Sequence, residues 1–340
     1  MSKTTLDLST LNLSEGTHTI TVKAKAEGYT DSDASNAVNY TAAAPIPTDS
    51  ILFAGETSDF TLKATNKTWK GTVEYSTDKN TWSTWDGSEI TSADKKLYLR
   101  GKNNTTFYTT KAIQFVLSAK AGCYGNINTL LDYENPPTAV ASSCYREMFY
   151  GCTLLTTAPE LPATTLAYAC YSSMFYGCRS LTAAPALPAT TLAESCYYYM
   201  FGSCKSLTTA PELPAEILAD YCYYSMFQGC TSLTTAPELP AIALVDSCYC
   251  NMFYSCRSLT TAPALPATTL ADRCYRSMFS DCTGIKISAT QTGEYTTAWR
   301  IPSTGEIAAE ATDWNTDMLN GTGGTFKGDP SINTTYYIAG

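Results

Sequence analysis

Histidine is nearly absent from this chain, which has one residue, His18, in 340. This scarcity excludes metal sites built on several imidazoles and any mechanism that needs two of them. We expect His18 to be an ordinary strand residue rather than a ligand or a base. The sequence also lacks a nucleophile elbow, a phosphate-binding loop and a cysteine paired with a histidine. We therefore expect no enzyme activity, no catalytic residue, no cofactor and no bound metal.

Positive charge is also scarce. The chain has 22 Lys and Arg against 31 Asp and Glu, which gives a net charge of −9. Such a chain is poorly suited to neutralising phosphates, so nucleic-acid binding and attachment to anionic membranes are unfavourable. No apolar run approaches the roughly 20 residues of a membrane-spanning helix, and we expect no insertion into a membrane. Hydrophobic residues make up 44% of the chain, a composition that does not indicate disorder.

Tyrosine and cysteine, in contrast, are abundant, with 24 and 14 residues, and cysteine is periodic. Twelve of the cysteines form two series that advance in steps of 26 residues. The first series is Cys144, Cys170, Cys196, Cys222, Cys248 and Cys274, and the second is Cys152, Cys178, Cys204, Cys230, Cys256 and Cys282. A Met-Phe pair recurs with the same period, beginning at Met148-Phe149. Six units in register predict a solenoid, in which each unit buries its apolar face by stacking on its neighbours.

Each unit is expected to form a short helix followed by a short strand. In the first unit Cys144, Met148 and Cys152 form one apolar stripe if the segment is helical. Gly151 near the end of that segment suits the left-handed conformation that ends a helix. The segment 155–157 is typical of a strand, which ends before Pro159 because proline has no amide proton. We assign ten residues of the first two units to the repeat core: Cys144, Met148, Phe149, Cys152, Leu155, Cys170, Met174, Phe175, Cys178 and Leu181.

The runs Met174 to Thr182 and Met226 to Thr234 share the form M-F-x-x-C-x-S-L-T, which resembles leucine-rich repeats of the BspA type. The resemblance covers the chain from about residue 120 to its end and implies a leucine-rich-repeat solenoid with short helices and short parallel strands. Repeats of this kind occur in bacterial surface proteins and in phage-encoded proteins. The chain departs from the family in its proline-rich A-P-x-L-P segment and in its second cysteine series.

The chain before the repeats is expected to be β-structure, because polar and apolar residues alternate along it. Strands are indicated at 6–13, 17–25 and 37–40, and in a second group at 60–63, 71–76, 96–100 and 112–117. The first group resembles part of an immunoglobulin-like or fibronectin-like module, since a whole sandwich needs roughly 100 residues. At the other end of the chain, Met318-Leu319 is similar to the recurrent Met-Phe pair.

The predicted fold class is therefore α+β and multidomain, with N-terminal β-sandwich-like modules followed by the leucine-rich-repeat solenoid. The expected parts are a partial β-module for docking at 1–42, a linker at 43–50, a second β-module at 51–120, an N-terminal solenoid cap at 121–143, the repeat array at 144–282 and a C-terminal cap at 283–340.

The cysteines are expected to be buried thiols in two columns. The two cysteines of one unit are eight residues apart, which on a helix separates them by about 12 Å. That distance is too long for a disulfide, and the spacing does not match zinc motifs. Disulfides between stacked units and a metal site are the alternatives. Cys250 belongs to neither series, and we expect it on the outward side, where it would be open to reaction.

The tyrosines supply the candidate binding surface. The column that follows the first cysteine series, from Tyr145 to Tyr275, is expected in the core. The less regular tyrosines are expected at the surface, where rigid amphipathic rings favour binding to proteins and sugars. These candidate ligand-surface residues are Tyr150, Tyr176, Tyr198, Tyr199, Tyr224 and Tyr254. A recurrent glutamate at positions 160, 212 and 238 suggests a wall for cations or sugars, but we favour a solvated column, because Ala186 and Ala264 interrupt it.

The function that we predict is that of a phage virion structural protein, of fibre or decoration type and without enzyme activity. The first residues show no secretory signal pattern, which fits assembly in the cytoplasm, reduced cysteines and release as part of a particle. The N-terminal strands would dock on other virion or surface-assembly proteins, and the repeat array would bind a host-surface protein or glycan. An incomplete sandwich also leaves assembly into a homo-oligomer open. The alternatives are a secreted BspA-like adhesin on the bacterial cell surface and a passive capsid decoration or spacer protein.

Overall fold

The computed structural model describes residues 16–20, 38–42, 46–301 and 313–339. The chain divides into two compact units, Met1–Pro47 and Thr48–Gly340. In the first unit β1 (Gly16–Ile20) pairs antiparallel with β2 (Val38–Ala42), and His18 lies opposite Tyr40 in the backbone register. The strand predicted at 6–13 lies outside the described residues.

The second unit begins with two sheets. The larger has the strand order β11-β10-β3-β8-β5-β6, and the smaller has the order β7-β4-β9. The strands of the larger sheet are β3 (Ile51–Gly55), β5 (Thr72–Ser76), β6 (Ser83–Thr84), β8 (Lys96–Lys102), β10 (Ala121–Tyr124) and β11 (Leu155–Thr157). Those of the smaller sheet are β4 (Thr61–Ala64), β7 (Ile90–Thr91) and β9 (Phe115–Leu117).

The strands predicted in this region are confirmed, since β4, β5, β8 and β9 overlap them. The prediction missed β3 and β10, in which three successive residues are buried. A strand that is buried on both faces does not alternate between polar and apolar residues, so it gives no period of two. The two missed strands pair with each other, and β10 also pairs with β11 of the first repeat unit. The sheet therefore continues into the repeats.

Aromatic rings of this region lie against the first repeat unit. The ring of Phe107 stacks on that of Tyr145, with centroids 6.1 Å apart, and Phe115 meets Phe149 edge to face at 5.7 Å. The amide of Phe115 donates to the carbonyl oxygen of Met148 at 2.8 Å. These contacts cover the apolar end that the first unit would otherwise expose.

The prediction of helices in the repeat units is wrong. Within the described residues the one helical element is the 3-10 helix η2 (Ile127–Leu130), which precedes the repeats. In the first repeat unit every fourth residue has a left-handed backbone conformation: φ is +54° at Ser143, +60° at Glu147 and +68° at Gly151. An α-helix requires negative φ throughout. The fold class is therefore nearly all β and turn rather than α+β, and the expected leucine-rich-repeat solenoid of short helices and parallel strands is not formed.

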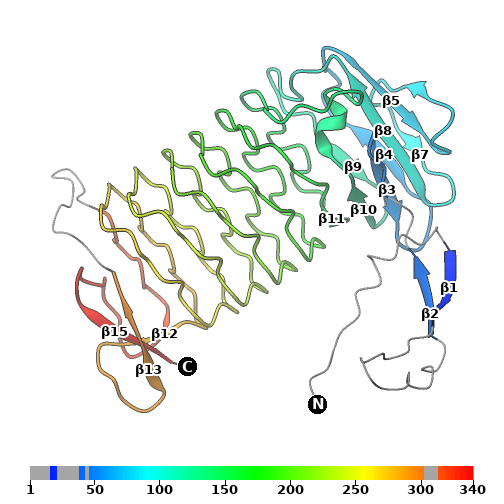
Figure 1. Cartoon of the computed structure of the whole chain (residues 1–340). Coiled ribbons are helices and arrows are strands. Elements are labelled where there is room, and N and C mark those ends of the chain that lie inside the picture. The colour runs from blue at the N-terminus through cyan, green and yellow to red at the C-terminus, as the bar shows by residue number, and fades with distance from the viewer. Residues whose placement is uncertain (1–15, 21–37, 43–45, 302–312, 340) are drawn as a thin grey trace, which may run out of the picture. The chain divides into compact units, whose positions relative to one another are not determined.

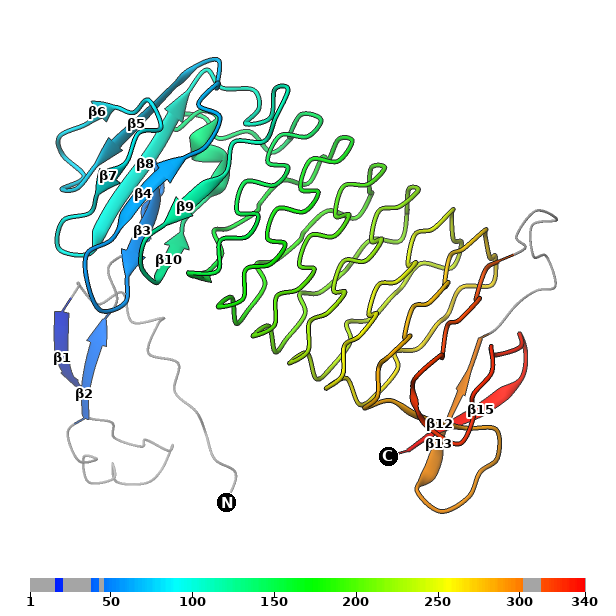
Figure 2. The ribbon, with the colours of Figure 1, turned by 180° about the vertical axis from the view of Figure 1, so that it is seen from behind.

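The backbone of each unit alternates between bonds along the chain and bonds to the next unit. The amides of Tyr145 and Phe149 donate to the carbonyl oxygens of Cys170 and Met174, at 2.8 and 2.9 Å. Between them, the amide of Met148 donates to the carbonyl oxygen of Tyr145, three residues earlier, at 3.2 Å. Each segment is thus a series of tight turns, and the turns of successive units stack in register. Figures 1 and 2 show these units as parallel coils, coloured green to yellow.

The parallel strand expected in every unit forms in the first unit, as β11, and at the equivalent position of the sixth, where β12 (Lys286–Ser288) pairs parallel with β14 (Gly323–Gly324). In the units between them the same position makes single bridges, such as Ala183 with Thr209 and Thr209 with Thr235. The amide of Thr234 lies 3.4 Å from the carbonyl oxygen of Thr208. Proline follows closely in the first five units and supplies no amide for a longer ladder, whereas the sixth unit has Ala289 at that position.

The core of the repeats consists of columns of identical side chains. All ten residues that we assigned to the repeat core are buried. The rings of the Tyr145 column stack at 5.8–6.0 Å, and those of the Phe149 column stack at 5.5–5.7 Å. All fourteen cysteines are buried free thiols. Each unit therefore adds the same set of apolar contacts to the stack.

The last sheet lies after the repeats, at the C-terminal end of the compact unit Thr48–Gly340. Its order is β13-β15-β12-β14, and its strands are β12 (Lys286–Ser288), β13 (Tyr295–Arg300), β14 (Gly323–Gly324) and β15 (Thr335–Ala339). Met318 takes the place of the next repeat methionine, since the amide of Phe279 donates to its carbonyl oxygen at 3.0 Å. Met318 and Leu319 are both buried, as the Met-Phe pairs of the repeat units are, which confirms that they correspond to such a pair. No helix in the described parts of the chain has the length and hydrophobicity to span a bilayer.

Candidate functional site

The four-residue turn period decides which side chains of a repeat unit face solvent. In each unit the Cys-Tyr and Met-Phe pairs are buried, and most of the residues one or two positions after each pair lie at or near the surface, with Ser172, Ser225 and Cys250 among the buried exceptions. In the third unit, for example, Tyr198 and Tyr199 follow the buried pair Cys196-Tyr197 and are half-buried. The outward positions can vary between units because the stacking of the core does not depend on them.

Five tyrosines at such positions, together with Tyr221, which precedes the pair Cys222-Tyr223, form a continuous chain of ring contacts that we call the tyrosine cluster. Its members are Tyr150, Tyr176, Tyr198, Tyr199, Tyr221 and Tyr224. Tyr150 and Tyr176 stack at 5.1 Å, and Tyr198 and Tyr224 stack at 5.0 Å. Tyr199 lies between these two stacks, 6.0 Å from Tyr176 and 4.8 Å from Tyr198. Tyr150 is 45% exposed, and the other five rings are half-buried.

Gly202 allows the two stacks to meet. It occupies the position that Tyr150 and Tyr176 hold in the first two units, so the first stack ends there. A Cβ on Gly202 would lie 2.7 Å from Cδ2 of Tyr176 and 3.3 Å from Cδ1 of Tyr199. The missing side chain therefore leaves the space in which these two rings come together.

Five of the six tyrosines that the sequence indicated as ligand-surface residues belong to this cluster. The sixth, Tyr254, lies outside it, next to Asp281, whose negative charge raises the pKa of the Tyr254 hydroxyl. The sequence analysis missed Tyr221. That tyrosine precedes the buried pair Cys222-Tyr223, at a position where the other units have Ser143, Ala169, Ser195, Ser247 and Arg273. Serine is the commonest residue there, and the one available signal was a tyrosine 26 residues before a serine and 52 before an arginine.

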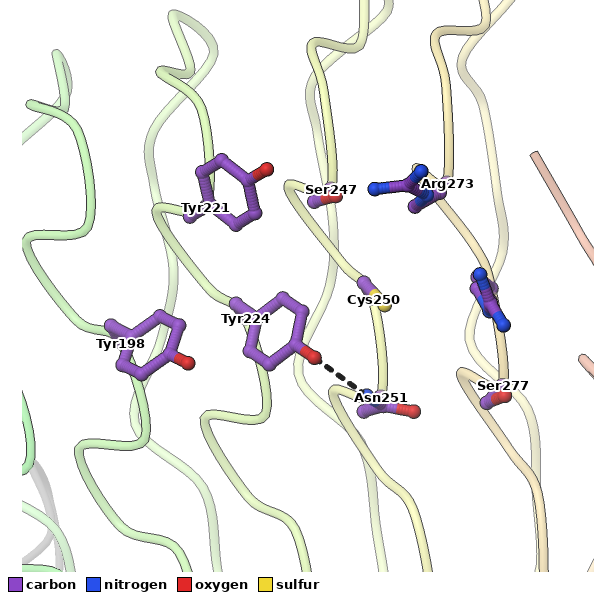
Figure 3. A pocket seen from close by; sticks show the side chains of 9 residues that line it. Tyr198, Tyr221, Tyr224, Ser247, Cys250, Asn251, Arg273 and Ser277 are labelled. Atoms are coloured by element: carbon purple, nitrogen blue, oxygen red, sulfur yellow. Dashed lines mark hydrogen bonds between the residues drawn. The ribbon is translucent and has the colours of Figure 1, made fainter. Parts of the chain in front are cut away.

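A cavity of about 410 Å³ opens at one end of the tyrosine cluster. Tyr198, Tyr221 and Tyr224 line it on one side, and Arg273 and Arg276 line it on the other. Figure 3 shows Tyr221 and Tyr224 facing Arg273 across the smaller side chains of one intervening unit. We call this cavity the arginine–tyrosine pocket.

Small side chains in that intervening unit create the pocket. Tyr221, Ser247 and Arg273 hold the same position in three successive units. Tyr224, Cys250 and Arg276 hold a second such position beside it. In both columns a short side chain stands between two long ones, so the surface dips at the middle unit. Ser247 and Cys250 therefore form the floor of the pocket.

Both arginines of the pocket have acidic neighbours outside its lining. Nε of Arg273 lies 3.5 Å from Oδ2 of Asp272, and Nη1 of Arg276 lies 3.6 Å from Oδ2 of Asp313. Neither aspartate lines the cavity, and no other carboxylate does. The side chains of Arg273 and Arg276 are 45% and 41% exposed, so solvent or a ligand can reach them.

The hydroxyl groups of the pocket stay protonated at neutral pH. Burial raises the pKa of Tyr224 to about 12, and its hydroxyl oxygen accepts a hydrogen bond from Nδ2 of Asn251 at 3.2 Å. The carboxylate of Asp246 raises the pKa of Tyr221. Both tyrosines are therefore neutral where they line the pocket.

Cys250 lies at an outward position, because it lines the pocket, but the expectation that it is open to reaction is wrong. Cys250 is only 3% exposed, and burial raises the pKa of its thiol to about 11. The longer side chains of Tyr224 and Arg276, which hold the same position in the adjacent units, lie on either side of it. A thiol in this environment is a poor nucleophile.

The recurrent glutamates lie on another part of each unit, among the prolines. Glu160, Glu212 and Glu238 are exposed, and alanine interrupts their column at 186 and 264. Between successive proline segments lie shallow hollows of about 330 to 580 Å³. Nowhere in the described residues do three potential metal ligands gather into one group.

The tyrosine cluster and the arginine–tyrosine pocket form one continuous surface with aromatic faces and a cationic end. Tyrosine rings stack on flat apolar faces while their hydroxyls form hydrogen bonds, and guanidinium groups bind carboxylates. This arrangement suits recognition of a ligand. Comparisons with protein-family models, with curated proteins and with solved structures yield no match to this chain.

Proposed function

We propose that this protein is a non-enzymatic attachment protein of a phage virion, and that its repeat array binds a glycan or a protein of the host surface. The observation that carries the proposal is the tyrosine cluster, in which six rings make continuous contacts at outward positions. Solubility does not require such a cluster, and contiguous exposed aromatic surface is typical of binding sites.

The residue type supports binding. A tyrosine ring has a large contact area and few rotatable bonds, so little conformational entropy is lost when it is fixed against a ligand. The contacts within the cluster restrict the rings further before any ligand arrives, as in the stack of Tyr198 on Tyr224 at 5.0 Å. A partly ordered surface of this kind lowers the entropic cost of association.

The cysteines support a virion as the setting. Fourteen buried free thiols suit a chain that folds in a reducing compartment, as virion proteins assembled in the cytoplasm do. The resemblance to BspA-type repeats agrees with this setting, since such repeats occur in phage-encoded proteins as well as in bacterial surface proteins. The N-terminal strands would then attach the chain to the particle.

Binding of the fluorescently labelled full chain to a glycan array and to host cells tests the attachment role. We expect the double variant Tyr176→Ala/Tyr199→Ala to lose about tenfold or more in binding, because ring stacking is removed at the centre of the cluster. Tyr168→Ala is the matched control, since Tyr168 is 50% exposed and makes no ring contact among the described residues. Equal binding by all three proteins would refute the attachment role.

Immunogold electron microscopy on the native source, with an antibody against residues 144–282, tests the setting. Label on phage particles would support a virion protein, and its position would distinguish a fibre from a decoration protein. Label on the bacterial envelope without particles would contradict the virion and favour a secreted adhesin.

A further inference from the structure

We infer that the arginine–tyrosine pocket binds the carboxylate-bearing sugar of an acidic saccharide. The inference rests on the proposed function, because it names the ligand class of the same surface. Acidic saccharides combine a flat apolar ring face, hydroxyl groups and an anion within a few ångströms. The pocket offers aromatic rings, polar groups and two guanidinium groups over a similar distance.

The charge of the pocket lining is opposite to that of the chain. The protein has a net charge of −9, yet its pocket is lined by Arg273 and Arg276 and by no carboxylate. The ion pairs with Asp272 and Asp313 are long, 3.5 and 3.6 Å, and each engages one side of a guanidinium group. A guanidinium has five N–H donors, so donors remain for an anion. A planar carboxylate matches the guanidinium fork and can accept two of them.

The wall opposite the arginines is aromatic and flat. Tyr198 and Tyr224 stack face to face with an interplanar angle of 12°, so Tyr224 ends the stack, and its other ring face lies on the side of Cys250, the next position of the column. Asn251 holds the hydroxyl of Tyr224 at 3.2 Å and restricts that ring. The apolar face of a sugar ring can stack on this wall while its carboxylate reaches the arginines. The cavity volume of about 410 Å³ lies within the roughly 300–1,000 Å³ that is usual for small-molecule sites.

One substitution can fill the pocket with a side chain that the same column already contains in two other units. In Cys250→Tyr the column Tyr198–Tyr224 would continue by one ring, at the position that forms the floor of the pocket. Cys250→Ser is its control, because serine is short and leaves the pocket open. Arg276→Gln removes one charge with little change in size. Arg257→Gln is its control, because Arg257 is an exposed arginine of the array outside the pocket.

Isothermal titration of the full chain with defined saccharides tests the inference. The acidic probes are trigalacturonate and 3′-sialyllactose, and the neutral probes are galactotriose and lactose. We expect at least one acidic probe to bind about tenfold or more tightly than its neutral counterpart. Cys250→Tyr and Arg276→Gln should each weaken that binding about tenfold, and the two controls should not change it. Raising the NaCl concentration should weaken it as well, because the arginines are partly exposed.

Three results would overturn the inference: equal binding of acidic and neutral probes, binding of neither acidic probe, or unchanged binding by Cys250→Tyr. Tighter binding of lactose 3′-sulfate than of both carboxylates would overturn the assignment of the anion. The proposed function fails separately, since it depends on the loss of cell binding in the Tyr176→Ala/Tyr199→Ala variant. Loss of cell binding without a preference for acidic probes would refute only the present inference.

Discussion

The thiol of Cys178 donates a hydrogen bond to the carbonyl oxygen of Phe149 in the preceding unit, with Sγ and O 3.1 Å apart. The same bond links each later pair of units at 2.9–3.1 Å, from Cys204 to Phe175, Cys230 to Phe201, Cys256 to Phe227 and Cys282 to Phe253. The position requires a small, largely apolar side chain that can still donate a proton. Cysteine meets these requirements, and this explains the second cysteine series from Cys178 onward.

Truncation of this side chain is expected to destabilise the array. Cys230→Ala removes the sulfur and its bond to the Phe201 carbonyl, and we expect a loss of roughly 1–2 kcal/mol. Cys230→Val keeps apolar volume but has no donor, so the difference between the two variants separates packing from hydrogen bonding. Thermal unfolding followed by circular dichroism provides the measurement, with the exposed Thr260→Ala as the control. Wild-type stability of Cys230→Ala would show that the thiol does not link the units.

Alkaline pH is expected to unfold the protein through the buried thiols of both cysteine series. Burial raises the pKa of Cys152 to about 11 and of Cys170 and Cys222 to about 12, from the ordinary 9.0. The folded state thus favours the neutral thiol. This stabilisation is complete below the unfolded-state pKa and is lost as the pH rises from about 9 toward the folded-state values. Burial shifts the pKa of Tyr197 and Tyr223 in the same direction.

We therefore expect the melting temperature to be constant between about pH 7 and 8.5 and to fall progressively above about pH 9. A sample returned from high pH to neutral pH in the presence of reductant should regain its melting temperature, which distinguishes titration from chemical damage. A melting temperature that stays constant to about pH 11 would contradict burial of neutral thiols.

The sequence predicts the repeat register and the inward residues because every unit must present the same apolar set to its neighbours. It does not predict the local conformation. Apolar residues at 144, 145, 148, 149 and 152 fit a period of 3.6 and a period of four equally well over nine residues. The distinguishing signal lies in the outward positions. Gly151, Gly177 and Gly229 mark one left-handed column, and the Ser143 and Glu147 positions mark two more at four-residue spacing.

The candidate site could be predicted only in part. Regular tyrosines belong to the core and irregular ones to the surface, because core positions are identical in every unit. The pocket arises instead from a contrast between neighbouring units, in which Ser247 and Cys250 stand between longer side chains. That contrast becomes visible only when residues 26 apart are placed side by side, and Cys250 then changes from an exposed thiol to the floor of a pocket.

The left-handed columns predict opposite effects of two substitutions. Gly229 has a φ of +72°, and the atom nearest to an added Cβ is Oγ of Ser203 at 3.6 Å. Gly229→Ala therefore has room and should destabilise mainly through backbone strain, by about 1 kcal/mol. Ser203, at +60°, occupies the same column, and Ser203→Gly should relieve strain. The gain should stay below about 1 kcal/mol, because glycine also loosens the unfolded chain.

Thermal unfolding of both variants provides the measurement, with Ser232→Ala, at a half-buried position outside these columns, as the control. A melting temperature that falls for Ser203→Gly or rises for Gly229→Ala would contradict a left-handed backbone at this column.

Gly202 should affect binding more than stability. The structure gives Gly202 no left-handed φ, so alanine is not strained there, but its Cβ would lie 2.7 Å from Cδ2 of Tyr176. The ring of Tyr176 would have to move away and lose its contact with Tyr199, which separates the two stacks of the tyrosine cluster. We expect Gly202→Ala to weaken binding to cells or glycans several-fold while lowering the melting temperature only slightly, because the displaced atoms belong to a half-buried side chain.

Gly229→Ala supplies the reverse case, with lower stability and unchanged binding, since Gly229 lies outside the ring contacts of the cluster. Binding measured for both variants at a temperature well below their transitions separates the two effects. Unchanged binding by Gly202→Ala would mean that the two stacks act independently, and the surface would then be two short aromatic sites rather than one continuous site.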